Sequence, residues 1–234
     1  MTQLEMQLSF KADSKNRTAV RLGFYSSSVA FIGAAGYGIV QMLQLGGILK
    51  FPLDAILIYG FSLGIAVPYV IAIISLHHSL PEEKTVWSHL AVAFAIMYAV
   101  YVNLNYVVQL ATVIPASMDG SLSQIRILDQ TPHSLFWDID ALGYICMGVS
   151  TFFLAFAFSG QYKWLRIFLF ANALMVPVIS FIYFYPDFSI KLLLIGFPWI
   201  ITTCGSLLLI AYYFHSERTV SSDRFVSRRS SSWT

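Results

Sequence analysis

Residues 86–114 read VWSHLAVAFAIMYAVYVNLNYVVQLATVI, and this stretch decides the fold class. It contains no Asp, Glu, Lys or Arg, and it is longer than the roughly 20 residues with which a helix crosses the hydrocarbon core of a bilayer. Its apolar residues run continuously instead of alternating, which favours a helix over the strand of a membrane barrel. The stretch is therefore predicted to be a transmembrane helix.

Apolar runs of similar length occur five more times along the chain. Hydrophobic residues make up 57% of the sequence, charged residues 11%, and the mean hydropathy is +0.69, so there are too few charges to cover the surface of a soluble domain. We expect an all-α polytopic membrane protein with one bundle of six helices, an N-terminal segment at 1–21 and a basic, serine-rich tail at 215–234. The six predicted transmembrane helices are 22–45, 53–76, 86–114, 139–158, 164–184 and 190–214.

The basic residues are distributed unequally between the two sides of such a bundle. Three lie on the side of the odd-numbered loops, namely Lys50, Arg126 and Lys191, and the rest of the 14 lysines and arginines lie in the even-numbered loops and the terminal segments. The positive-inside rule then places both termini in the cytoplasm, and we expect the plasma membrane as the location. The net charge of +2 is small and dispersed, which argues against a nucleic-acid partner.

Small residues and prolines predict how the helices pack. Small side chains recur every four residues in the first helix, and the second helix has glycines with the same spacing, patterns that allow close approach of two helices in a membrane. These residues are Ser26, Ala30, Ala34, Gly38, Gly60 and Gly64. Pro68, Pro177 and Pro198 lie inside the second, fifth and sixth predicted helices and are expected to kink them or to free a backbone carbonyl.

The third predicted helix carries a polar stripe. Positions three and four apart share one face of a helix, and this spacing connects Tyr98, Tyr101, Asn105, Gln109 and Thr112. An unpaired amide facing lipid costs several kcal/mol, so the stripe is expected to face the interior of the bundle. Amides in membrane helices often serve as hydrogen-bonding links between helices, so helix packing is an alternative to a binding role.

The fourth predicted helix carries a matching stripe. Thr131 and Pro132 are typical of an N-cap and a first helical position, so this helix is expected to begin near Thr131, after an outer loop at 115–130. An acidic side chain in a membrane helix costs free energy to bury, so Asp140 is a candidate for function. His133 lies two turns before Asp140 on the same predicted face, where the two could form an acid–base pair. The stripe consists of His133, Trp137, Asp140, Tyr144, Met147 and Thr151.

Two segments resemble a group of uncharacterised prokaryotic polytopic membrane proteins. They are NYVVQLATVIPASMDG, residues 105–120, and TPHSLFWDIDALGYICMG, residues 131–148. In that group an Asn-Tyr…Gln helix is followed by an outer loop and a Pro-His…Leu-Gly-Tyr helix. The resemblance extends from the second to the sixth predicted helix and implies a six-helix fold in a bacterial or archaeal membrane. It implies no activity and no cofactor.

Three functional hypotheses follow from the two stripes. The first is a carrier, sensor or accessory subunit that binds a small or lipid-like ligand in an outward-facing pocket between the third and fourth helices. The second is an enzyme that acts on a lipid through His133 and Asp140, and the third is a structural subunit of a larger membrane complex. The histidines lack metal-binding spacing, and no nucleophile or phosphate-binding motif occurs, so we favour binding over catalysis and predict no metal site. The predicted ligand-binding residues are Tyr98, Tyr101, Asn105, Gln109, His133, Trp137, Asp140 and Tyr144.

Overall fold

The computed structural model describes the backbone of residues 3–230 and the side chains of residues 17–219. The chain is 85% helical, and the residues so described contain no β-strand. Six segments are long and apolar enough to cross a membrane, and each overlaps one predicted run, which confirms an all-α protein with six candidate spans. These spans, numbered one to six below, are Arg17–Leu45, Leu53–Ser79, Glu82–Met118, Leu135–Ala155, Gly160–Phe184 and Ile190–Thr219. The side of the membrane on which the termini lie stays a prediction.

Several spans consist of more than one helix. The longer helices are α1 (Gln3–Leu45), α2 (Leu53–Ser79), α3 (Thr85–Val108), α5 (Leu135–Ala155), α6 (Lys163–Ala173), α7 (Met175–Phe184) and α9 (Pro198–Ser230). The short ones are α4 (Ile114–Met118), α8 (Ile190–Ile195), the π-turn η2 (Gln109–Val113) and the 3₁₀ turns η1 (Glu82–Lys84), η3 (Leu122–Gln124), η4 (Arg126–Leu128) and η5 (Gly160–Tyr162). Helices α1 and α9 continue past the apolar runs that predicted them, because an apolar run marks only the part of a helix suited to the hydrocarbon core.

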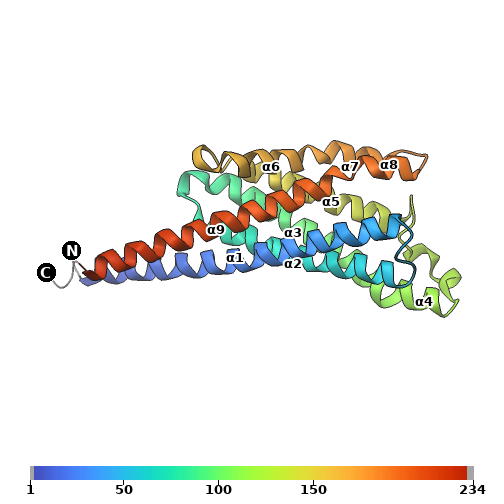
Figure 1. The fold of residues 1–234 in the computed structure, drawn as a ribbon, viewed down its shortest axis with the longest axis horizontal. Coiled ribbons are helices and arrows are strands. Elements are labelled where there is room, and N and C mark those ends of the chain that lie inside the picture. Colours follow the sequence, from blue (N-terminus) through green and yellow to red (C-terminus); the bar gives the residue numbers. More distant parts are fainter. Residues whose placement is uncertain (1–2, 231–234) are drawn as a thin grey trace.

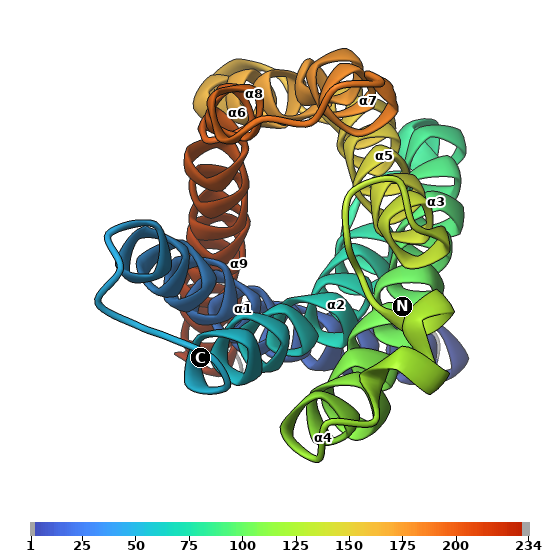
Figure 2. The same ribbon diagram turned by 90° about the vertical axis from the view of Figure 1, so that its right-hand side faces the viewer.

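The six spans form a closed ring. Seen end-on, α1 is followed by α2, α3 and α5, then by α6 to α8, and α9 returns to α1 (Figure 2). In the side view, α1 and α9 run together beyond the other helices at the end where both termini lie (Figure 1). The opposite end carries α4 and α8 and the loops that join α1 to α2, α4 to α5 and α7 to α8, and we call it the loop end.

Small residues allow α1 to pack closely against both of its neighbours. A Cβ atom added to Gly33 would lie 3.0 Å from the backbone of Gly64 in α2, and one added to Gly38 would lie 2.7 Å from the Ile200 side chain in α9. The predicted close approach is therefore confirmed for Gly38 and Gly64. The expectation is wrong for Gly60, which is exposed and has nothing within 4 Å of its added Cβ, because its side of α2 is turned away from the ring.

Prolines interrupt the last two spans. Pro177 has no N–H to bond the carbonyl of Ala173, and the fifth span changes from α6 to α7 at Leu174. Pro198 stands at the start of α9, where a missing N–H costs least, and the sixth span is divided there into α8 and α9. The kinks predicted at these two prolines are thus breaks between separate helices, whereas Pro68 lies inside α2, which is one helix from Leu53 to Ser79.

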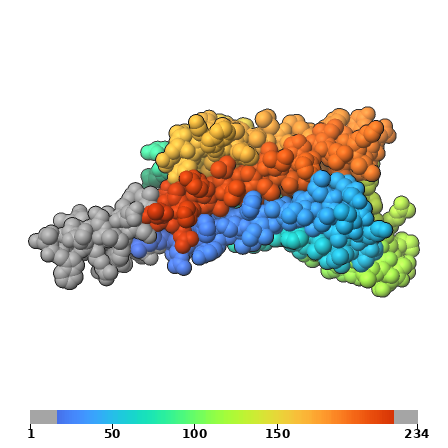
Figure 3. Space-filling view, in the orientation of Figure 1, coloured from blue at the N-terminus to red at the C-terminus, as the bar shows by residue number. Residues whose placement is uncertain are grey.

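The outer surface is apolar, as a lipid-facing surface must be. Val100, Leu104 and Val107 are 59%, 52% and 51% exposed on α3, opposite its polar stripe. In the space-filling view, atoms of α1, α9 and the α6–α8 segment cover one side of the ring (Figure 3). Polar side chains such as Asn105, Gln109 and Asp140 are buried instead. The candidate site must therefore be sought among interior residues near the loop end.

Candidate functional site

The polar stripe of α3 faces the interior, as predicted, along most of its length. Asn105 and Gln109 are buried, and so is Tyr98, whose ring packs edge-on against Tyr69 at 5.5 Å between centroids. Tyr101 is half-buried beside α5. Thr112 is exposed, contrary to the prediction, because the π-turn at Gln109–Val113 adds one residue to the turn and rotates the following side chains.

The stripe of α5 is also buried from Trp137 onward, but its helix begins later than predicted. Ser134, and not Thr131, is the N-cap, since its hydroxyl accepts a hydrogen bond from the backbone N–H of Trp137 at 3.2 Å. His133 precedes the helix with a φ of +65° and is exposed. It therefore does not share a helical face with Asp140, and the predicted acid–base pair does not form.

The two stripes meet in a network centred on Asp140. Asn105 donates through Nδ2 to Oδ1 of Asp140 at 3.2 Å and to Oε1 of Gln130 at 2.9 Å. Gln130 and Tyr183 both donate to Oδ2 of Asp140, at 3.0 Å and 2.8 Å. Amide donors reach both oxygens, Asn105 at Oδ1 and Gln130 at Oδ2, and such donors favour the ionised form of a carboxyl group.

The loop before α5 completes this network. Gln109 donates through Nε2 to the carbonyl of Leu128 at 2.8 Å and accepts at 3.2 Å from the backbone N–H of Gln130. These bonds hold the loop against the end of α3, so that Gln130 reaches Asp140. The facing stripes are thus confirmed, but their amides pair with one another and with the loop. Polar packing therefore accounts for the space between α3 and α5.

A pocket lies on another side of α5, inside the ring. It is a small, partly open cavity of about 70 Å³ between α1, α5, α7 and the start of α9, and its walls are Tyr37, Tyr144, Ile179, Ile182, Tyr183, Gly196 and Trp199. A second pocket of about 70 Å³ shares Tyr37, Gly196 and Trp199 with it and is also lined by residues of α8 and by Leu45, whose side chain is exposed. The two pockets are therefore adjacent at the loop end.

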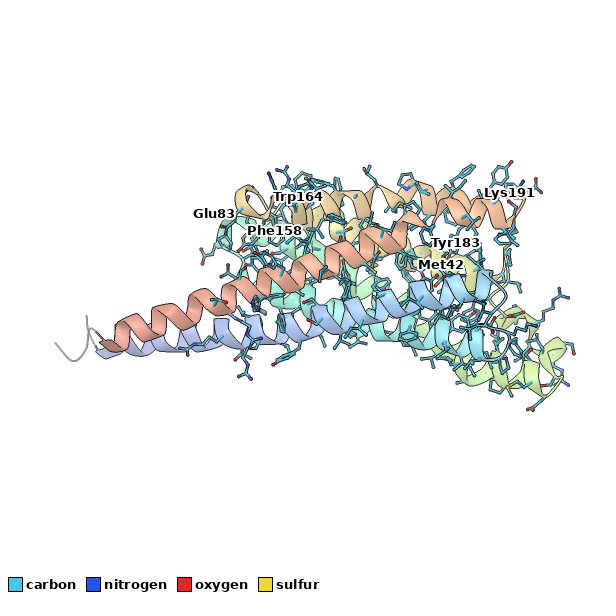
Figure 4. All side chains as sticks on the ribbon, viewed as in Figure 1. Met42, Glu83, Phe158, Trp164, Tyr183 and Lys191 are labelled. Carbon is cyan, nitrogen blue, oxygen red and sulfur yellow. The ribbon has the colours of Figure 1, made fainter. Side chains whose placement is uncertain are left out.

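Aromatic rings form most of the wall of the inner pocket. Trp199 meets Tyr144 edge-on at 4.7 Å and Tyr37 edge-on at 5.9 Å between centroids. Tyr183, Met42 and Lys191 all lie toward the loop end of the molecule (Figure 4). The ring of Tyr183 stacks at 4.3 Å on Trp137, whose indole N–H donates to the Tyr183 carbonyl at 3.2 Å. Tyr183 therefore belongs both to the pocket wall and to the Asp140 network.

The pocket wall carries a hydrogen-bonding group that the protein does not use. Trp199 is 6% exposed, and its indole N–H has no partner. Leaving such a buried donor unpaired costs about 1–3 kcal/mol. The Tyr144 hydroxyl is already hydrogen-bonded to the Tyr106 hydroxyl at 3.2 Å. The indole N–H of Trp199 is thus the unpaired donor on the wall that an acceptor inside the pocket could use.

The structure sorts the predicted site residues into three groups. Tyr144 lines the pocket, and Trp137 and Asp140 support Tyr183 from behind. The residues that lie elsewhere, in the polar packing, in the core or outside the helix, are Tyr98, Tyr101, Asn105, Gln109 and His133.

Other pocket and network residues did not belong to the predicted stripes. Tyr37, Tyr183 and Trp199 come from the first, fifth and sixth spans, and Gln130 comes from a loop. Each is a polar or aromatic residue near the loop end. Such residues also anchor helices at the membrane interface, so the sequence did not distinguish these site residues from anchors.

Comparisons with known proteins found no matching family model, no matching curated protein and no matching solved structure. The resemblance to prokaryotic six-helix proteins accordingly stays a prediction. Among the residues whose side chains are described, no group of three or more His, Cys, Asp or Glu side chains is placed to hold a metal ion. The proposal below therefore rests on the pocket.

Proposed function

We propose that this protein binds a small, partly apolar ligand inside the membrane, in the pocket between α1, α5, α7 and α9. The observation that carries the proposal is the unpaired N–H of Trp199 in the wall of that pocket. A buried donor without a partner is rare in folded proteins, and an acceptor atom on a ligand would satisfy it. The plasma membrane remains the expected location, and a carrier, a sensor or an accessory subunit would each use such a pocket.

The lining indicates what the ligand must offer. Ile179, Ile182 and the tyrosine rings provide apolar surface, which is typical of small-molecule sites that add a few directed polar groups. The Trp199 N–H can donate a hydrogen bond. The Tyr183 oxygen, whose hydrogen is used on Asp140, can accept one. A molecule with an apolar body and at least one acceptor atom fits this arrangement.

The test is to identify what the pocket retains. We would purify the full chain in mild detergent, record native mass spectra and identify any bound molecule after extraction. Trp199→Phe keeps an aromatic ring and removes the unpaired N–H, so the bound molecule should fall at least severalfold in occupancy. Trp164→Phe is the matched control, since Trp164 is 59% exposed and lies toward the opposite end of the molecule (Figure 4).

The two variants must differ for the proposal to stand. A bound molecule present at equal occupancy in both variants and in the parent protein would show that Trp199 does not hold it. A parent protein that carries no molecule would overturn the proposal if it also gave no thermal shift across a screen of small amphiphilic acceptors.

A further inference from the structure

The charge of Asp140 has no partner of opposite sign. Its three hydrogen-bond donors are an asparagine, a glutamine and a tyrosine, all neutral, and within residues 17–219 it forms no ion pair. Burying an ionised carboxylate is costly even when it is hydrogen-bonded, and a nearby cation lowers that cost. The carboxylate bonds directly to Tyr183, a wall residue of the pocket, so its negative potential extends into the pocket.

The pocket wall itself attracts positive charge. The face of an aromatic ring is electronegative, and a cation held against Trp or Tyr gains from each ring that it touches. Tyr37, Tyr144, Tyr183 and Trp199 supply four such rings around one pocket. Tyr144 and Tyr37 are almost perpendicular to Trp199, at 85° and 89°, so the rings present faces in different directions.

The surface at the loop end also carries more negative than positive charge. Aspartates outnumber basic residues in the loops and helix ends there, which favours the approach of cations from water. The aspartates are Asp54, Asp119, Asp129, Asp138 and Asp187, and the basic residues are Lys50, Arg126 and Lys191.

Together these observations identify a class of ligand. We infer that the pocket between α1, α5, α7 and α9 takes a compact organic cation of the quaternary-ammonium type, an inference that rests on the proposed function. Its alkyl groups contact the rings of Tyr37, Tyr144 and Trp199, and Asp140 supplies the counter-charge from behind Tyr183. A hydroxyl or ester oxygen on the same ligand accepts from the Trp199 N–H.

An organic cation fits this wall better than a metal ion does. Alkali and alkaline-earth ions need several converging oxygen ligands, whereas this wall combines isoleucines with aromatic rings and an N–H donor that would repel a bare ion. A quaternary ammonium group needs no hydrogen-bond acceptor, and aromatic faces replace its weak hydration shell. The same group occurs in free solutes such as choline and in the headgroup of phosphatidylcholine.

The experiment compares choline with its neutral isostere, in which a tert-butyl group replaces the trimethylammonium group. Calorimetric titration of the full chain in phosphatidylglycerol nanodiscs should give at least about tenfold tighter binding of choline, as two or more cation–π contacts near a carboxylate would produce. Asp140→Asn should remove most of this preference. Glu83→Gln, at an exposed carboxylate toward the opposite end of the molecule (Figure 4), should leave it unchanged.

A second variant guards against misfolding of Asp140→Asn. Tyr37→Leu removes one aromatic face without touching the Asp140 network, because the Tyr37 hydroxyl bonds to Gln41. It should weaken binding of choline more than binding of the isostere. Repeating the choline titration in phosphatidylcholine nanodiscs separates the two sources of the cation. Weaker binding of choline there would show that the lipid headgroup competes for the pocket, and an unchanged choline affinity would identify the free solute as the ligand. Both results support the inferred class.

The outcomes also separate this inference from the proposed function. Equal binding of choline and its isostere would overturn the cationic ligand while leaving a working pocket. Failure of both probes, alongside a neutral molecule that co-purifies in a Trp199-dependent manner, would do the same. Failure of both probes, with nothing co-purifying and no thermal shift across the screen of amphiphilic acceptors, would overturn the two proposals together.

Discussion

The Asn105→Leu substitution tests the network that joins α3 to α5. Asn105 is fully buried and makes three hydrogen bonds: it donates to Gln130 at 2.9 Å and to Asp140 at 3.2 Å, and it accepts from Gln109 at 3.3 Å. Leucine has a similar size but makes none of these bonds. One oxygen of the Asp140 carboxylate would then lose its donor within the protein interior.

The expected loss of stability follows from these bonds. A neutral hydrogen bond contributes about 1 kcal/mol and one to a charged group about 2 kcal/mol, which gives roughly 3 kcal/mol for the donated pair. Hydrogen bonds between membrane helices contribute less when they are measured, because the unfolded chain in lipid also finds hydrogen-bond partners. The lower limit of the expected loss of stability is therefore roughly 2 kcal/mol. The leucine side chain regains little, because lipid is as apolar as the protein interior.

Equilibrium unfolding in mixed detergent–SDS micelles, followed by circular dichroism, measures this difference. Asn103→Leu is the matched control, since Asn103 lies on the same helix, half-buried and outside the network. We expect Asn105→Leu to be less stable than the control by roughly 2–3 kcal/mol. If the two variants unfold within about 0.5 kcal/mol of each other, the network does not stabilise the contact between α3 and α5.

Two further predictions concern helix packing and sidedness. Gly143→Ala should destabilise the protein by about 1–3 kcal/mol in the same assay, because the added Cβ would lie 2.5 Å from the side chain of Val102. The control is Gly60→Ala, which has open space around it and should be neutral or stabilising by up to about 1 kcal/mol. Equal effects of the two substitutions would refute the close packing of α5 on α3. For sidedness, a membrane-impermeant maleimide should label Ser123→Cys but not Glu83→Cys in intact cells, in a background without the two native cysteines, and the reverse pattern would refute cytoplasmic termini.

The pairing of α3 with α5 could be predicted from the sequence because helical periodicity and the cost of exposed amides act together. Asn105 and Asp140 each stand at the centre of a polar stripe in an apolar helix, and lipid leaves such side chains no other direction to face. That argument uses properties of each helix by itself. It therefore holds wherever the backbone stays regular.

Helical periodicity gave wrong positions where the backbone departs from a regular helix. Thr112 follows a π-turn, and His133 precedes the actual N-cap with a positive φ, so neither obeys the period of its neighbours. The pocket could not be located either, because Tyr37, Tyr183 and Trp199 come from three spans whose order around the ring is set by tertiary packing. No single-helix pattern contains that order.

The breaks in the fifth and sixth spans give the pocket two mechanically different sides. Tyr37 and Tyr144 belong to α1 and α5, which run through the membrane as unbroken rods, whereas Tyr183 belongs to α7, a ten-residue piece separated from α6 at Leu174. We therefore expect a change in the width of the cavity to come from a tilt of this short helix and of the six-residue α8, and not from a movement of α1 or α5. A molecule bound in the pocket would then be held and released by these two short helices.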